Sequence, residues 1–160
     1  MPSTNSLGPL QLAKSLVSPA AYYRTGLVLV PRELMGRESE LAAIVWADPL
    51  DWVEWKLEHL DPGCRFLSLS HEALLGDVSL IASQAAPGSC VLAYNGDVLL
   101  SGMPADERAF FWRFLRTALR PTNAVIVALP AGAANLLPHR EATAWIGAGR
   151  LAEWGEGGRD

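Results

Sequence analysis

Short runs of consecutive apolar residues occur along the chain at 26–30, 90–94 and 124–129. Continuous apolar character, without the alternation of a half-exposed strand, is typical of parallel strands that are covered on both faces. We therefore predict a buried strand in each run. The expected sheet core consists of Leu27, Val28, Leu29, Val91, Leu92, Val125, Ile126 and Val127. Two further segments, 65–69 and 150–154, are also predicted to be strands.

Between these runs, apolar residues return at helical spacing. The predicted helices cover residues 10–17, 32–45, 53–60, 71–84, 104–119, 131–137 and 141–146. Residues 46–52 mix a strand-like start with a turn at Pro49 and receive no assignment. Because strands that alternate with helices indicate crossover units, we expect a three-layer α/β/α domain with a mostly parallel sheet. It should span residues 9–154, with flexible segments at 1–8 and 155–160.

Composition narrows the function classes. Half of the 160 residues are hydrophobic, which suits one domain with one sizeable core. The formal net charge of −4 argues against a wholly basic surface, so any contact with nucleic acid is expected to be indirect. Cys64 and Cys90 form no CxxC pair, which favours a reducing, cytoplasmic location. No apolar run reaches the roughly 18 residues of a membrane span, so no membrane association is expected.

Ligands of parallel sheets usually bind at the carboxyl ends of the strands. After the first apolar run, residues 31–37 occupy the place where a phosphate-binding loop would lie. Such a loop needs several glycines and a lysine, whereas this segment has one glycine, no lysine and the acidic Glu33. The composition therefore predicts that this loop does not bind phosphate.

Asn95 and Asp97 follow the 90–94 run, where some nucleotide-binding folds carry an acid that holds a magnesium-bound water. The acid position is occupied by Asn95, and a neutral amide binds magnesium weakly. The alternative is a polar turn in which Asn and Asp side chains cap the next segment. The sequence leaves both interpretations open.

Other chemistry-bearing residues form no recognised constellation. His59, Cys64, His71 and Cys90 lack metal-ligand spacing, so no metal site is predicted. Ser70 precedes His71, but it is expected to cap the 71–84 helix, and no G-x-S-x-G elbow is present. We therefore predict no catalytic residue and no cofactor, and the pattern favours a protein that is not an enzyme.

Two features favour a role in protein interaction. Arg113, Arg116 and Arg120 recur at helical spacing and form a basic stripe that is either a solvated face or a docking site for an anionic partner. Six tryptophans in 160 residues are many, and tryptophan is enriched in interface anchors. We predict that Trp154, followed by Trp55, is exposed and anchors a contact.

The order of the predicted elements resembles the P-loop NTPase core. Within that group the chain is most similar to the small BrxF-type proteins of BREX phage-defence systems, over roughly residues 10–155. The likeness lies in the segments 22–30, 66–69, 90–100, 124–129 and 150–154. The phosphate loop of the family, which would fall at 31–37, is not matched, so no catalytic residue is carried over. The resemblance implies a cytosolic bacterial accessory subunit with a degenerate nucleotide-binding fold.

The sequence therefore predicts a non-catalytic accessory subunit that interacts with other proteins or with itself. An alternative is a nucleotide-binding or nucleotide-hydrolysing subunit whose site is atypical or shared with a partner chain. A further alternative is a DNA-binding accessory protein that uses the basic stripe, which the acidic net charge disfavours.

Overall fold

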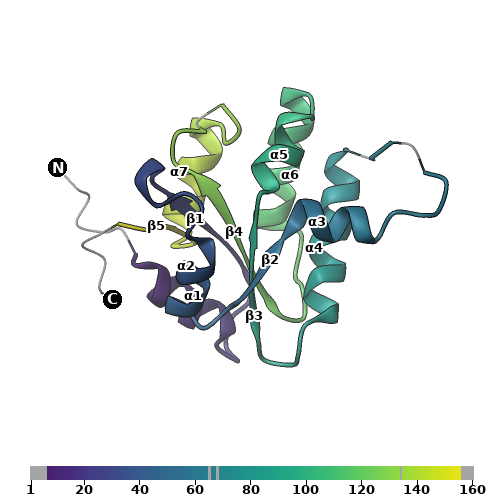
Figure 1. The fold of residues 1–160 in the computed structure, drawn as a ribbon. Helices are drawn as coiled ribbons and strands as arrows, with labels where there is room; N and C mark the ends of the chain where they lie inside the picture. The colour runs from purple at the N-terminus through teal and green to yellow at the C-terminus, as the bar shows by residue number, and fades with distance from the viewer. Residues whose placement is uncertain (1–6, 65, 68, 134, 156–160) are drawn as a thin grey trace.

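The computed structural model describes residues 7–64, 66–67, 69–133 and 135–155 (Figure 1). Its elements follow one another in the order α1 (Pro9–Val17), β1 (Thr25–Val30), η1 (Arg32–Leu34), α2 (Glu38–Ile44), β2 (Asp48–Asp51), α3 (Trp52–Glu58), α4 (His71–Gln84), β3 (Cys90–Tyr94), α5 (Gly96–Ser101), α6 (Ala105–Thr117), β4 (Ala124–Pro130), α7 (His139–Gly147) and β5 (Leu151–Glu153). Strands and helices alternate over most of this length, as the apolar pattern predicts.

Within the described residues, the strands form one sheet in the order β2-β3-β4-β1-β5, and every neighbouring pair is parallel. Apolar side chains of α1 and α2 pack on one face of this sheet. Those of α3, α4, α5, α6 and α7 pack on the other face, and Figure 1 shows the two helical layers. The prediction of a three-layer α/β/α domain with a parallel sheet is therefore confirmed.

The predicted sheet core is buried, with one exception. Leu27, Val91, Val125 and Val127 face the α3–α7 layer. Val28, Leu92 and Ile126 face the α1–α2 layer, as the period of two along a strand requires. Leu29 is only partly buried because it lines a cavity at the carboxyl end of β1.

The strand predicted at 65–69 is wrong for the residues that the structure describes. Phe66, Leu67 and Leu69 adopt no strand conformation, while residues 65 and 68 lie outside the described residues. β3 has β4 on one side, and on its other side lies β2, in the segment that received no assignment. The β2 sequence, DPLD, is polar and contains proline because β2 is an edge strand with a neighbour on one side only.

Helix boundaries also differ from the prediction. The helix expected at 32–45 is interrupted by Gly36 at φ +88°, so a 3₁₀ turn precedes α2, which begins only at Glu38. The described part of 131–137 forms turns in place of the predicted helix, although Leu136 and Leu137 are buried. The unpredicted helix α5 follows β3 directly.

The first described residue, Leu7, forms an isolated parallel bridge with Ala152 beside β5. Residues 1–6 and 156–160, predicted to be flexible, lie outside the described residues. None of the helices in the described part of the chain combines the length and apolar character that crossing a membrane requires.

Arg150 is buried and ties the sheet to two helices. Its guanidinium donates to the Thr25 carbonyl oxygen (2.8 Å), to the Thr25 hydroxyl and to the Arg116 carbonyl oxygen (2.7 Å). The same group lies over the rings of Tyr23 and Trp145. No carboxylate among the described residues pairs with it. Burial lowers the pKa of Arg150 to about 10, so the side chain stays charged at neutral pH.

We expect Arg150→Lys to lower the free energy of unfolding by about 2–4 kcal/mol. A lysine ammonium keeps the charge but lacks the planar fork that reaches three acceptors, so buried carbonyl groups lose their donors. Urea denaturation followed by circular dichroism measures the effect. Arg120→Lys is the matched control, because Arg120 stacks on the exposed Tyr22, and it should change stability by less than about 0.5 kcal/mol. Equal stabilities for the two variants would contradict the role given to Arg150.

Candidate functional site

The strands β1 and β4 are neighbours, but the connections that follow them leave in opposite directions (Figure 1). The chain after β1 enters α2 on one face of the sheet, and the chain after β4 leads to α7 on the other. In open parallel sheets such a reversal opens a crevice at the carboxyl ends of the strands, where ligands usually bind. The candidate ligand site is therefore the edge formed by Val30, Pro130 and the segments that follow them.

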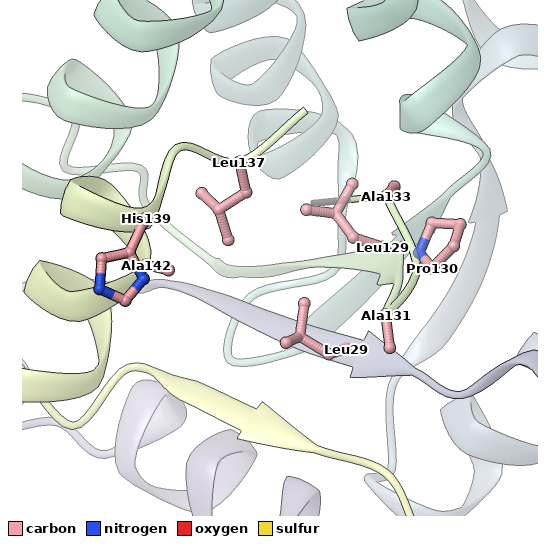
Figure 2. Close-up of a pocket in the computed structure, with 8 residues that line it drawn as sticks. All are labelled: Leu29, Leu129, Pro130, Ala131, Ala133, Leu137, His139 and Ala142. Atoms are coloured by element: carbon pink, nitrogen blue, oxygen red, sulfur yellow. The ribbon is translucent and has the colours of Figure 1, made fainter. Parts of the chain in front are cut away.

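An apolar cavity of about 190 Å³ opens on the α7 side of this edge (Figure 2). Its lining residues are Leu29, Leu129, Pro130, Ala131, Ala133, Leu137, His139 and Ala142. Among them only His139, the first residue of α7, carries a titratable side chain, and it is exposed. The cavity is smaller than the roughly 300–1,000 Å³ that is typical of small-molecule sites.

A second cavity, of about 30 Å³, lies on the α2 side of the same edge and is acidic. Its lining residues are Val30, Met35, Glu38, Asn95, Asp97, Ala128, Leu129 and Pro130. Burial, followed by the negative charges of Asp51, Glu38 and Glu54, raises the pKa of the neighbouring Tyr94. The field at this corner of the sheet therefore disfavours an anion such as phosphate.

Asn95 and Asp97 both lie at this second cavity. Asn95 adopts a left-handed conformation (φ 64°) ahead of α5, and its side-chain amide donates to Asp51 Oδ2 at 2.9 Å. Asp97 lies in the first turn of α5, where a negative charge complements the helix dipole. No group of three His, Cys, Asp or Glu side chains in the described part of the chain could hold a metal ion. The Asn95 side chain makes no hydrogen bond that caps α5, because its amide is directed to Asp51.

Most backbone N–H groups of the loop at 31–37 form hydrogen bonds within the chain. The N–H groups of residues 34, 35 and 37 donate to the carbonyl oxygens of residues 31, 32 and 34, and that of Gly36 donates to Glu38 Oε1 at 3.3 Å. A phosphate-binding loop needs free N–H groups that converge on the anion. These four donors already have partners within the chain, so the loop offers phosphate no preformed cradle.

The predicted arginine stripe does not form one surface. Arg116 pairs with Glu141 of α7 at 3.3 Å, and Arg120 lies over the ring of Tyr22. Arg113 is exposed and lines a groove between α6 and α7 together with Arg116. Only two of the three arginines therefore lie at a common site.

The predicted exposure of Trp154 and Trp55 is wrong. Trp154 is only 6% exposed and belongs to the core cluster that includes the buried residues of α1. Its backbone N–H donates to the Leu29 carbonyl oxygen. Trp55 is 7% exposed, and its indole N–H donates to Gln84 Oε1 at 3.1 Å. Both rings belong to the core because helices cover the strands beside them.

The exposed tryptophan is Trp46, which the sequence analysis did not single out. Its side chain is 74% exposed and its φ is +56°. The backbone N–H of Trp46 donates to the Ala43 carbonyl oxygen, and the backbone N–H of Ala47 donates to the Ala42 carbonyl oxygen. This is the Schellman pattern that ends a helix with a left-handed residue, a position usually occupied by glycine. Beside Trp46, a cavity of about 220 Å³ is lined by Lys14, whose ammonium lies 5.5 Å from the indole ring centre.

His71 and Glu107 form a pair that sequence analysis also missed. The Glu107 carboxylate accepts hydrogen bonds from the His71 backbone N–H (2.9 Å) and ring Nδ1, and so caps α4 from α6. These two hydrogen bonds, the backbone one first, hold the pKa of Glu107 below its ordinary value of 4.5. The His71 ring lies against Phe110 and Phe114. The pair therefore joins two helices, and neither residue lines a cavity described above.

Comparison with known proteins finds no matching family model and no matching curated protein.

We expect Glu107→Gln to remove part of the acid sensitivity of the fold. Because the pKa of Glu107 is lower in the folded chain, its contribution is complete above pH 4.5 and is lost as the pH falls through the folded value. Urea denaturation at a series of pH values between about 6 and 3 should give a shallower decline for the variant. Glu72→Gln, on the exposed neighbour of His71, should retain the wild-type slope, and identical slopes for both variants would contradict the assignment.

Proposed function

We propose that this chain is a non-catalytic protein-interaction subunit built on a degenerate nucleotide-binding fold. The parallel sheet with a reversal at its carboxyl edge supports the resemblance to the P-loop NTPase core. The resemblance to BrxF-type proteins is the basis for placing it in a bacterial multi-protein defence system. The compartment that this proposal implies is the cytoplasm.

The carboxyl edge supports the non-catalytic part of the proposal. The N–H groups of residues 34–37, in the loop after β1, are bonded within the chain. The adjoining cavity, about 30 Å³ in volume, is lined by Glu38 and Asp97. A nucleoside triphosphate would need several free donors, a larger cavity and positive charge at this place. The same geometry weighs against the alternative of a nucleotide-hydrolysing subunit.

The observation that carries the interaction role is Trp46. A side chain in the left-handed region costs about 1–2 kcal/mol relative to glycine, and a large ring exposed to water recovers little by burial. The cation–π contact with Lys14 is worth only about 0.5–1 kcal/mol at an exposed site. The strain at this position therefore equals or exceeds what the fold gains from the Lys14 contact. A strained, exposed aromatic residue is accounted for by a partner that buries it.

Isothermal titration with Mg-ATP and Mg-GTP tests the non-catalytic part. We expect dissociation constants no tighter than about 1 mM, corresponding to about −4 kcal/mol of binding free energy. Micromolar binding by the isolated chain would instead favour the nucleotide-binding alternative.

Trp46→Gly tests the interaction role, because stability and binding should respond differently. Relief of the left-handed strain is offset by the lost Lys14 contact and by the flexibility of unfolded glycine. The free energy of unfolding should therefore stay unchanged or rise by up to about 1 kcal/mol. Association with a partner, or with a second copy, should weaken by about 2 kcal/mol or more. The measurements are chemical denaturation and size-exclusion chromatography with light scattering, alone and with the protein that co-purifies with the wild type.

Tyr22→Ala is the matched control, since Tyr22 is also an exposed aromatic side chain, at 64%, and should leave assembly unchanged. If the Trp46→Gly chain keeps the wild-type mass and the wild-type partner, Trp46 is not an interface anchor. If it unfolds, the assignment of Trp46 to a strained helix end is itself wrong.

A further inference from the structure

A groove with a volume of about 450 Å³ runs between α6 and α7 and shares no lining residue with the cavity beside Trp46 or with the carboxyl-edge cavities. Its polar side chains are Arg113 and Arg116 from α6 and Arg140 and Glu141 from α7. Phe110, which is 42% exposed, and small apolar residues complete the lining. The groove thus combines an apolar surface with charged groups.

The charge of the groove is opposite to that of the chain. Three arginines and one glutamate give the groove a formal charge of +2, whereas the whole chain carries −4. Glu141 is 8% exposed and is already bonded to Arg116, so this pair forms part of the wall between the helices. The excess positive charge therefore belongs to Arg113 and Arg140.

Among the described residues, Arg113 and Arg140 have no partner for their charge. Both are exposed, and neither side chain makes a hydrogen bond or ion pair with another described residue. An arginine guanidinium can hold a carboxylate through two parallel hydrogen bonds. Their guanidinium groups are thus free to bind an anion that enters the groove.

The position of Arg140 is also unfavourable for the isolated fold. It is the second residue of α7, directly after His139, where the helix dipole is positive and a cation is destabilising. The α7 N-cap, Pro138, provides no side-chain acceptor for the N–H groups of the first turn. Glu141 places one negative charge in the same turn, but its carboxylate is bonded to Arg116. A carboxylate bound beside Arg140 would therefore pair with a guanidinium that makes no ion pair with another described residue.

We propose that this groove docks an acidic segment of a partner protein, with carboxylates on Arg113 and Arg140 and an apolar side chain against Phe110. The inference rests on the proposed interaction function and names the chemistry of one partner surface. A peptide fits better than nucleic acid because the charged groups of the groove lie beside an apolar lining formed by Ala109, Phe110, Pro138 and Ala144. An aliphatic side chain of a peptide can be buried against this lining while its carboxylates reach the arginines.

Fluorescence anisotropy with a labelled peptide of alternating glutamate pairs and single leucines tests the proposal. The wild-type chain should bind this probe, and the R113Q/R140Q double variant should bind it at least about tenfold more weakly, because it loses two charge-assisted contacts. The Arg140→Gln single variant should show an intermediate loss. Added salt should weaken binding to the wild type more than to the double variant.

Arg120→Gln is the matched control, since it removes the same charge from the same stripe outside the groove. It should change peptide affinity by less than about twofold. All substituted positions are exposed, and circular dichroism checks that each variant is folded. A single-stranded oligonucleotide of matched charge is the competing probe.

Three results would overturn the proposal: no peptide binding by the wild type, equal binding by the double variant, or tighter binding of the oligonucleotide than of the peptide. These failures are separable from failure of the proposed function. A chain that loses its partner on Trp46→Gly substitution but ignores the peptide keeps the interaction role and loses this groove. A chain that binds the peptide through Arg113 and Arg140, yet binds Mg-ATP at micromolar concentration, keeps the groove and loses the non-catalytic assignment.

Discussion

A buried guanidinium without a counterion fixes how the helical layer sits on the sheet. Arg150 follows α7, donates to the backbone and hydroxyl oxygens of Thr25 at the start of β1, and donates to the Arg116 carbonyl oxygen in the last turn of α6. Burying a charge without an acid is costly, so the three acceptors and two aromatic rings must stay in place. Arg150 therefore joins the end of α6 and the ring of Trp145 in α7 to the start of β1, next to the Arg116–Glu141 pair that connects the same two helices.

The carboxyl edge of the sheet has the strand arrangement of a ligand-binding site, but most backbone donors of the loop after β1 are already bonded within the chain. The reversal between β1 and β4 is present. The loop after β1, however, bonds its own N–H groups, and Asn95 donates to Asp51. Backbone donors committed in this way cannot turn to a ligand without breaking existing bonds, each worth about 1 kcal/mol net. This part of the molecule is therefore best understood as scaffold, and recognition falls to its side-chain surfaces.

The sequence was sufficient to predict strands that are buried on both faces, such as those formed by the runs at 26–30, 90–94 and 124–129. The sequence did not predict the strand β2, whose polar residues are tolerated because β2 lies at the edge of the sheet. It also failed for the tryptophans, because composition does not tell which helix covers which strand. His71 and Glu107 are 36 residues apart, and only the packing of α4 on α6 brings them together. No local signal marks Trp46, since glycine is the residue expected at its position.

The edges of the sheet limit how this chain can be recognised. β2 is four residues long, contains Pro49 and begins and ends with an aspartate, and β5 is three residues long with Leu7 bridged to it. Neither offers the row of free backbone groups that an incoming strand needs. A partner must therefore bind through contacts with side chains and not by adding a strand to the backbone of the sheet edge. Because surface side chains change by single substitutions while backbone edges do not, partner choice in this protein can diverge without any change in its fold.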